Sequence, residues 1–276
     1  MTANEEHEYV LGTGSDELER LGLQNRLWTD ASHALWKQAR IEPGQRVLDV
    51  GCGPGYAAFD LSQLVQSTGR VVGVDESTGF VSHVNTQAKA RGLPQLSALV
   101  GDVQELEEVL RGQPPFDLAY ARWVLCFVPH PEKVVAGVAS ALRPGGRFVV
   151  QDYFNYAAMT TAPRRAIFTK IVEATVRSWR ARGGDPDVVA RLPRMLRDAG
   201  LRIEHLAQQQ RVARRGESML HWGDSWWRNY VPKLVQMGEI GADDQRRFFA
   251  EWDSMQADTD FFVMPTVYEI VAVKAG

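Results

Sequence analysis

VLDVGCGPGY, residues 47–56, is the stretch of the sequence that decides the fold. Its apolar first half is typical of a buried strand, which we expect to end at Val50. Gly51, Gly53 and Gly55 then let the backbone turn tightly and approach a ligand with no Cβ in the way. Glycine-rich turns after a first strand also serve dinucleotide enzymes, so the turn by itself indicates only a ligand site.

Predicted strands and helices alternate around this turn. Apolar patterning predicts strands at 46–50, 70–77, 96–103, 116–125 and 147–154, and helices at 15–41, 57–66, 79–92 and 131–146. Strands separated by helices of this length connect through right-handed crossovers. We therefore expect a parallel sheet that is covered by helices on both faces.

The pattern changes beyond Phe154, where the alternation of strand and helix is interrupted. The segments that follow are a helical stretch over 156–184, a crossover helix over 187–200, a long alternating strand over 201–213, a tryptophan-rich helical stretch over 217–255 and a final alternating strand over 261–274. We interpret the segments at about 156–184 and 214–258 as helical insertions that cap the sheet.

The composition argues against several classes of protein. A formal charge of -3 gives no net field that gathers nucleic acid, so we expect no nucleic-acid partner. No run of about 18 apolar residues predicts a membrane span. The chain has 2 cysteines and opens with MTANEEHEYV, which lacks the basic and apolar segments of a secretory signal. We expect a cytoplasmic protein, without disulfides, that is a monomer or a homodimer.

Acidic residues close the two predicted strands that follow the turn. Asp75 ends the second strand, where a carboxylate can accept hydrogen bonds from both hydroxyls of a ribose. Asp102 ends the third strand, in a position to accept from an exocyclic adenine amine. The alternative for both residues is a purely structural role as an N-cap, because an acid at either place also caps the helix that follows.

Together these residues resemble the class I methyltransferase superfamily, over roughly residues 45–153. The resemblance implies S-adenosylmethionine as the cofactor. It also implies an α/β fold: a doubly wound, mostly parallel seven-stranded sheet with an antiparallel C-terminal strand, an N-terminal helix and helical cap insertions. A nicotinamide-binding turn spaces its glycines as GxGxxG and usually lacks an acid in the strand before them, whereas this turn is DVGCGPG.

The resemblance implies a role for each matching residue. Asp49 contacts the amine of the methionine part, directly or through water, and Arg122 and Trp123 lie beside the methionine tail. The alternatives are that Asp49 only satisfies loop amides and that Arg122 only pairs with a carboxylate at the edge of the core. The other implied contacts are Asp75 at the ribose, Glu76, Ser77, Asp102 and Val103 around the adenine, and Gly51, Cys52, Gly53 and Gly55 in the turn.

The stretch YVLGTGSDELERLGLQ, residues 9–24, is similar to a lead-in helix of a large bacterial subgroup of the family. In that subgroup the helix closes over the cofactor, so Tyr9, Arg20 and Gln24 are candidate contacts. We therefore divide the chain into a helical lead-in over 1–41 and a methyltransferase domain over 42–276, which contains both insertions.

Substrate-facing groups are expected at the end of the fifth strand and in the insertions, because these lie over the carboxyl edge of the sheet. We hypothesise that His221 or Asp152 is a general base, on location and residue type alone. The candidate substrate contacts are the aromatic residues Tyr153, Tyr156, Trp222, Trp226, Trp227 and Tyr230. The alternative for these aromatic residues is that they only pack the insertions against the sheet. Cys52 and Cys126 are interpreted as small apolar residues that fill space, and not as nucleophiles.

The predicted function is methyl transfer from S-adenosylmethionine to an O or N atom of a small molecule, by in-line displacement. No metal-ligand spacing is present in the sequence, so we expect no metal. Two other functions stay open: different chemistry on the same cofactor, of the decarboxylase or cyclase type, and a non-catalytic cofactor-binding partner.

Overall fold

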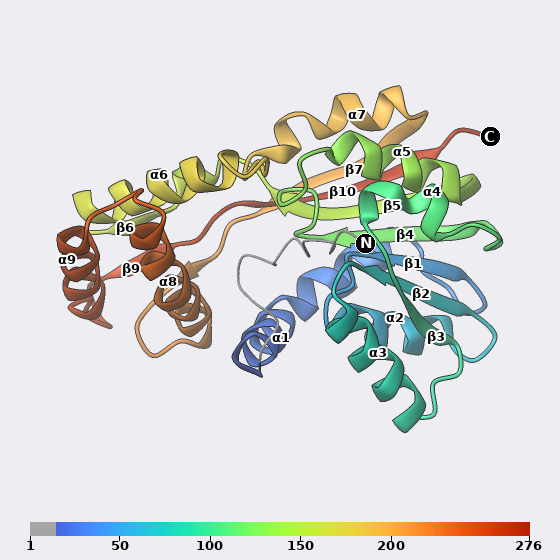
Figure 1. Ribbon diagram of the computed structural model, residues 1–276, viewed down its shortest axis with the longest axis horizontal. Helices are drawn as coiled ribbons and strands as arrows, with labels where there is room; N and C mark the ends of the chain where they lie inside the picture. The colour runs from blue at the N-terminus through green and yellow to red at the C-terminus, as the bar shows by residue number, and fades with distance from the viewer. Residues whose placement is uncertain (1–14) are drawn as a thin grey trace, which may run out of the picture.

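A sheet of seven strands organises the protein, and the computed structural model describes residues 15–276 (Figure 1). The strand order is β3-β2-β1-β4-β5-β10-β7, and β10 is antiparallel to both of its neighbours. The strands are β1 (Arg46–Val50), β2 (Arg70–Asp75), β3 (Leu96–Val100), β4 (Phe116–Arg122), β5 (Leu142–Tyr153), β7 (Leu201–Gln209) and β10 (Val267–Lys274). The predicted fold class, with its antiparallel C-terminal strand, is confirmed.

Helices cover both faces of this sheet, so most of its strands are apolar on both sides. Figure 1 shows α2 (Tyr56–Val65) and α3 (Thr78–Ala90) on one face, and α4 (Leu106–Val109), α5 (Pro131–Ala141) and α7 (Leu192–Asp198) on the other. Side chains alternate along each strand. In β1, Val47 packs into the core on the α2 side, while Leu48 and Val50 pack into the core on the opposite face.

The link between α5 and β5 differs from the prediction. The helix predicted over 131–146 ends at Ala141, and β5 begins at Leu142. Pro144 has no amide hydrogen to donate, and Gly145 has φ +73, which a helix does not allow. The Pro-Gly-Gly stretch that the sequence placed at the end of the helix therefore belongs to the start of the strand.

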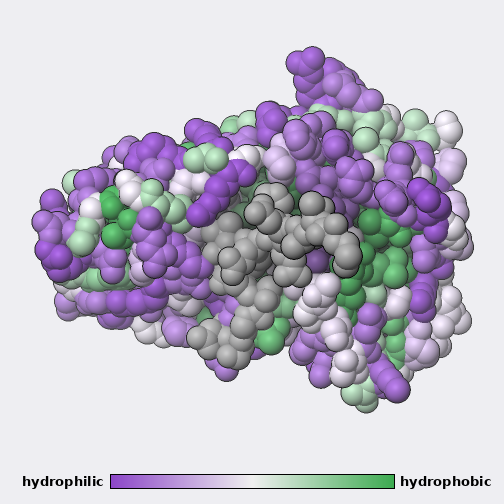
Figure 2. Space-filling view, in the orientation of Figure 1, coloured by the Kyte–Doolittle hydropathy of each residue, from purple (hydrophilic) through white to green (hydrophobic). Residues whose placement is uncertain are grey.

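A cap built from the second half of the chain lies beyond the sheet (Figure 1). It contains α6 (Ala166–Arg180), α8 (Ser218–Gln236), α9 (Ala242–Asp253) and a three-stranded sheet in the order β6 (Thr160–Ala162), β9 (Phe261–Val263), β8 (Val212–Ala213). The helices are amphipathic: α6 buries Ile167, Phe168, Ile171, Val172 and Trp179. Their outer faces are mostly hydrophilic, as Figure 2 shows for the side toward the viewer.

The small sheet corrects three predictions. The segment 156–184 was expected to be helical throughout, but it contains β6 and the short 3-10 helix η2 (Tyr156–Ala158) before α6. The strand expected over 201–213 is divided into β7 and β8, and the one over 261–274 into β9 and β10. Pro265 separates β9 from β10, since proline cannot donate to a ladder. The two remaining short 3-10 helices are η1 (Val103–Glu105) and η3 (Val188–Ala190).

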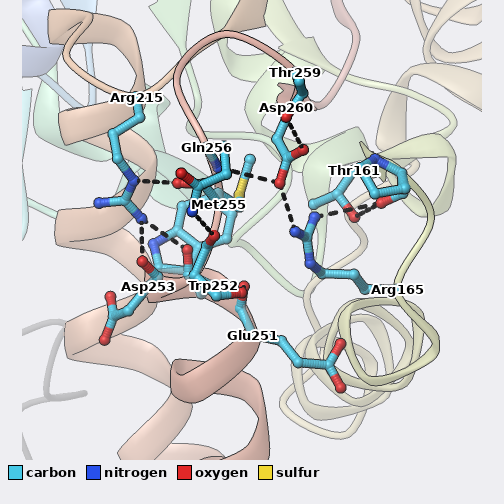
Figure 3. A network of polar contacts seen from close by, with 12 residues as sticks. Thr161, Arg165, Arg215, Glu251, Trp252, Asp253, Met255, Gln256, Thr259 and Asp260 are labelled. Atoms are coloured by element: carbon cyan, nitrogen blue, oxygen red, sulfur yellow. Dashed lines mark hydrogen bonds and ion pairs between the residues drawn. The ribbon is translucent and has the colours of Figure 1, made fainter.

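Aromatic packing and two arginines hold the cap together. Phe168, Trp227, Phe248, Trp252 and Phe262 form one cluster of ring contacts. Figure 3 shows Arg165 pointing at Asp260, to which it donates over 2.7 Å, and Arg215 pointing at the carbonyls that end α9. Arg215 donates to the main-chain oxygens of Met255, Trp252 and Asp253, where the negative end of the helix dipole favours a cation.

The helix α1 (Ser15–Gln38) joins the cap to the sheet. Arg211, which precedes β8, donates to the main-chain oxygen of Leu27 and to the carboxylate of Asp30 in α1. On the sheet side, the hydroxyl of Tyr56 at the start of α2 donates to the main-chain oxygen of Leu18 over 2.9 Å. Within the described residues, we find no helix with the length and apolar character needed to span a bilayer.

Candidate functional site

A cavity of about 920 Å³ lies between the sheet and the cap. One side, which we call the strand side, is formed by residues at the carboxyl ends of β1 to β4: Gly51 to Pro54, Asp75 to Ser77, Asp102 to Gln104, and Arg122 to Val124. The other side, which we call the cap side, is formed by the end of β5 and by the cap. Ligands of open α/β sheets bind outside the carboxyl ends of the strands, at this place in the fold.

The glycine-rich turn after β1 has three left-handed glycines with different surroundings. A Cβ on Gly51 (φ +63) would lie 2.6 Å from Cγ2 of Val124, and one on Gly55 (φ +83) would lie 2.6 Å from Cγ2 of Val84. A Cβ on Gly53 (φ +53) would meet no atom within 4 Å. Gly51 and Gly53 line the cavity, whereas Gly55 does not and serves the packing of α2 against α3.

Asp75 connects the turn to the end of β2. Its Oδ2 accepts the amide hydrogen of Gly53 over 2.8 Å, and its Oδ1 accepts that of Ser77 over 3.0 Å. Burial raises the pKa of Asp75. Each carboxylate oxygen has a second lone pair, so the group keeps acceptor capacity toward the cavity. The N-cap of α3 is Ser77, which accepts from the amide of Phe80, so the capping role considered for Asp75 belongs to its neighbour.

Asp102 both caps a helix and lines the cavity. Its Oδ1 accepts the amide hydrogen of Gln104 over 2.8 Å at the start of η1, as the structural alternative predicted. Val103 follows it and is buried, and Glu76, which is exposed, also lines the cavity. The segments at the ends of β2 and β3 therefore present three carboxylates, those of Asp75, Glu76 and Asp102, and the apolar side chain of Val103 to the same space.

Asp49 is the most deeply buried carboxylate of the strand side, with 3% of its surface exposed. Its Oδ2 accepts no hydrogen bond from the described residues. Burial raises the pKa of Asp49 to about 7, against the opposing effects of the Arg122 guanidinium and the Ala58 amide. A buried acceptor without a donor is costly, so the site fits a ligand that brings a cationic donor to this oxygen.

Arg122 and Trp123 lie at the end of β4. Arg122 donates to Oγ of Ser32 over 3.0 Å and to Oδ1 of Asn25 over 2.7 Å, so its hydrogen-bond partners are neutral groups of α1, while its charge acts on the carboxylate of Asp49. Trp123 has φ +53, which is rare for a bulky side chain and clusters at functional sites. Its ring lines the cavity beside the Arg122 guanidinium, 5.2 Å from the ring centroid.

Two of the three candidate contacts in the lead-in segment line the cavity. Arg20 is buried and paired with Glu17 over 2.6 Å. Gln24 accepts the indole hydrogen of Trp222 over 3.0 Å through its Oε1. Tyr9 lies outside the described residues. Arg20 and Gln24 thus stand where α1 meets the cap, at the junction of the two sides of the cavity.

The cap side is aromatic. Of the candidate substrate contacts, Tyr153, Tyr156, Trp222, Trp226 and Trp227 line the cavity. Tyr230 does not: its ring stacks on Trp226 at 4.8 Å, and its hydroxyl shares a hydrogen bond with Ser178. The prediction missed further lining residues, among them Phe127, Met159, Trp179, Arg182, Lys233 and Phe262. Helical spacing could have found Lys233, which lies seven residues after Trp226 on the same face of α8.

Neither candidate base lies in the cavity. His221 is exposed, because the face of α8 that carries Trp222 and Trp226 turns inward and leaves His221 outside. Asp152 is fully buried behind the cavity wall, where its oxygens accept the amide hydrogens of Cys126 and Tyr153. Burial raises the pKa of Asp152 to about 6. Its position makes it a support for the backbone after β4 and not a group that meets a substrate.

The two cysteines are buried free thiols. Cys52 lines the cavity, and its Cβ and Sγ occupy the space beside Gly73, where a Cβ would lie 2.7 Å from the sulfur. Cys126 is fully buried under Asp152. Burial raises the pKa of both thiols well above the usual value. Both side chains therefore act as small fillers and not as nucleophiles.

Known proteins with related sequences include several that are methyltransferases by name. Residues 41–212 match a family model described as a methyltransferase domain. Aklanonic acid methyltransferase of Streptomyces sp. (strain C5) is 32% identical over 133 residues, which are 48% of this chain and 58% of that protein. The 2-phytyl-1,4-naphtoquinone methyltransferase of Synechococcus elongatus is 35% identical over 127 residues, which are 44% of this chain and 53% of that protein.

The chain thus spans a little over half the length of these two curated relatives. A similar fold occurs in the crystal structure of the YcgJ protein of Bacillus subtilis. The TM-score is 0.59 at 18% identity, and the match covers 89% of this chain and 99% of that one.

Proposed function

This chain belongs to the class I S-adenosylmethionine-dependent methyltransferases, and we propose that it transfers a methyl group to an oxygen or nitrogen atom of a small molecule. The observation that supports this most is the division of one cavity into two sides. Carboxylates from three successive strands gather on the strand side, and aromatic rings from the cap form the other. A cofactor on the first side faces a substrate on the second.

The residues of the strand side fit the cofactor. Asp49 Oδ2 lacks a donor among the described side chains and amides, and the ammonium of the methionine part is a cationic donor of the right kind. The open space above Gly53 leaves room for the ligand to approach the backbone of the turn. Asp75, which retains acceptor capacity, would hold the ribose hydroxyls.

The remaining cofactor roles follow from position along the sheet edge. Glu76, Ser77, Asp102 and Val103 follow β2 and β3 and would surround the adenine. Arg122 ends β4 and Trp123 follows it, and both would lie beside the methionine tail, with Arg20 and Gln24 closing the site from α1. When bound, S-adenosylmethionine supplies an electrophilic methyl group. The protein's part is to place a nucleophile in line with it, and such positioning can lower a barrier by roughly 7–11 kcal/mol.

The size of the cavity supports a small acceptor. At about 920 Å³ it is near the upper end of the range for small-molecule sites, roughly 300–1,000 Å³. This leaves space for a cofactor and a second molecule. The two curated relatives described above are named for small-molecule acceptors, which supports the same class here.

Purified protein incubated with methyl-labelled S-adenosylmethionine and a pool of small metabolites tests the proposal. We expect labelled small-molecule product and S-adenosylhomocysteine in equal amounts. Binding of the cofactor with its consumption but without methylated product would instead favour the decarboxylase or cyclase type of chemistry, and binding without consumption would favour a non-catalytic partner. The variant Arg194→Gln, which changes an exposed residue of α7 outside the cavity, is the control that should behave as the wild type.

A further inference from the structure

The carboxylates of the cavity lie on one side only, whereas its basic residues lie on both: Arg122 is on the strand side and Arg20 is at the junction with the cap. Every carboxylate among its described lining residues lies on the strand side: Asp49, Asp75, Glu76 and Asp102. The charged residues that the cap contributes to the lining are Arg182, just after α6, and Lys233 in α8. A cation over acidic groups and an anion over basic groups are the favourable arrangement. The cofactor, a sulfonium with an ammonium, suits the first side, and an anionic substrate suits the second.

The two basic residues stand close to the aromatic rings of the cap side. Lys233 follows Trp226 and Tyr230 on one face of α8, at spacings of seven and three residues. Arg182 lies in the turn that follows α6, where its amide donates to the carbonyl of Trp179. Its side chain also acts on the Tyr230 hydroxyl: burial raises the pKa of Tyr230, and Ser178 and Arg182 lower it. The Arg182 side chain hydrogen-bonds the Tyr230 hydroxyl, and no carboxylate among residues 15–276 forms a salt bridge with it.

Trp123 of the strand side contacts aromatic rings of the cap side, and together these rings form flat walls of the cavity. Trp123 and Tyr153 are stacked, with ring centroids 6.0 Å apart and planes 22° apart, and Trp222 lies 5.9 Å from Trp123 at 32°. Trp179 meets Trp226 edge-on at 5.9 Å. Flat aromatic walls favour a planar aromatic ligand, which stacks on them.

Three of the indoles that line the cavity have N–H groups without an acceptor. The Nε1 atoms of Trp123, Trp226 and Trp227 are buried and unpartnered in the described part of the chain, whereas that of Trp222 donates to Gln24. Trp123 is 8% exposed and Trp227 is 0% exposed, so water does not satisfy them well. A ligand with several oxygen acceptors would remove this cost.

The cap side also lacks a proton acceptor. Its described lining residues include no Asp, Glu or His, since Asp152 lies behind the wall and His221 lies outside. Tyr153 and Tyr156 line it as neutral phenols, because burial raises the pKa of each. A nucleophile that needs deprotonation would find no base here. A carboxylate needs none, since its usual pKa lies near 4.

We propose that the acceptor is a planar aromatic carboxylate, bound against the aromatic rings of the cavity with its negative charge between the cofactor and the basic residues Arg182 and Lys233, and that the product is its methyl ester. The proposal rests on the methyl transfer proposed above. The carboxylate oxygen forms a bond to the methyl carbon while the carbon–sulfur bond breaks, and that bonding pair stays on sulfur. The sulfonium becomes a neutral thioether, the anion becomes a neutral ester, and no proton is released.

Four probes with matched shape test the binding part of this proposal: 2-naphthoate, neutral 2-naphthamide, cationic 2-(aminomethyl)naphthalene and non-aromatic cyclohexanecarboxylate. Each is titrated into the full chain with S-adenosylhomocysteine present, and quenching of tryptophan fluorescence is measured. We expect 2-naphthoate to bind at least about tenfold tighter than each of the others. Equal or tighter binding of the amide or the amine, or no binding of any naphthalene, would overturn the proposal.

Two variants locate the charge recognition. Arg182→Gln and Lys233→Gln should each weaken 2-naphthoate binding about tenfold and leave 2-naphthamide unchanged. Arg194→Gln, an exposed arginine of α7 outside the cavity, is the matched control and should change neither. If neither cavity variant alters the preference for naphthoate over naphthamide, the assignment of Arg182 and Lys233 is wrong.

Calorimetry with S-adenosylhomocysteine alone separates this proposal from the proposed function. If the cofactor product does not bind, the methyltransferase function itself fails. If it binds and the naphthalene series shows no preference for the anion, only the substrate class fails. For an accepted carboxylate, a pH-stat should record no proton release during turnover, whereas release of one proton per methyl group would contradict ester formation.

Discussion

The indole N–H of Trp222 donates to Oε1 of Gln24 over 3.0 Å, and this bond joins the cap helix α8 to α1 across the top of the cavity. Both residues line the site, so the bond also fixes the junction between the cofactor side and the substrate side. An interaction at that place influences both ligands.

Removing this bond should therefore affect stability and binding together. We expect Trp222→Phe and Gln24→Leu each to lower the free energy of unfolding, and to show a coupling of about 1 kcal/mol in a double-mutant cycle. The KM of both substrates should rise several-fold in each variant. Strictly additive losses in denaturant unfolding would contradict the proposed link.

Asp49 should make both stability and cofactor affinity depend on pH. Burial raises the pKa of this carboxyl to about 7, above its value in the unfolded chain, so the folded protein holds a proton that the unfolded chain releases. For this group, stability of the ligand-free protein therefore falls as pH rises from about 4 to about 7. In the ligand-free protein Asp49 prefers its protonated form, whereas a bound ammonium group favours the ionised carboxylate.

The variant Asp49→Asn tests this. In the wild type, affinity for S-adenosylhomocysteine should increase between pH 6 and pH 8, and the variant should bind about tenfold or more weakly with that increase lost. Calorimetry at several pH values gives both quantities. An unchanged affinity and an unchanged pH profile would show that this carboxylate does not meet the ammonium.

The glycines of the turn should differ in their sensitivity. Gly51→Ala places a Cβ 2.6 Å from Cγ2 of Val124 at a positive φ, and we expect it to cost about 2–4 kcal/mol of stability. Gly53→Ala meets open space and should cost about 1–2 kcal/mol while weakening cofactor binding more strongly. Denaturant unfolding and calorimetry separate the two effects.

Val124→Ala provides the control for the steric part. The double variant Gly51→Ala, Val124→Ala should lose less stability than the sum of the two single variants, because the smaller side chain makes room for the new methyl group. A loss of stability in the double variant that equals or exceeds this sum would mean that backbone strain, and not the contact with Val124, explains the requirement for glycine.

Neither His221 nor Asp152 should act as a base. We expect His221→Ala to keep the wild-type kcat within about twofold from pH 6 to pH 9, since this exposed side chain is outside the cavity. Asp152→Asn keeps the shape and one acceptor oxygen, so it should lower stability without moving the pH profile of kcat. If the pH dependence of kcat seen in the wild type disappeared in either variant, the substituted residue would be the base.

The sequence predicted the strand side of the site well because local chain features determine it. The turn after β1 needs glycines at positive φ, and an acid at the end of each following strand is brought to the same edge by the parallel topology. Asp49, Asp75 and Asp102 therefore lie together although they are up to 53 residues apart.

The cap was harder to predict because its contacts are distant in sequence. β6, β8 and β9 have two or three residues each, and β9 pairs with residues that lie 49 to 103 positions earlier in the chain, so no local pattern reveals them. Arg182 follows a helix whose end the periodicity did not locate, and nothing near it in the sequence indicates a cavity. For His221 a signal existed: Trp222, Trp226 and Lys233 share one helical face, and His221 is not on it.

A crystal structure of the protein with S-adenosylhomocysteine tests the central claim most directly. We predict that the ribose contacts Asp75, that the amino group lies within hydrogen-bond distance of Asp49 Oδ2, and that the sulfur faces the tryptophans of the cap. A ligand bound outside this cavity, or one whose amino group lies away from Asp49, would contradict it.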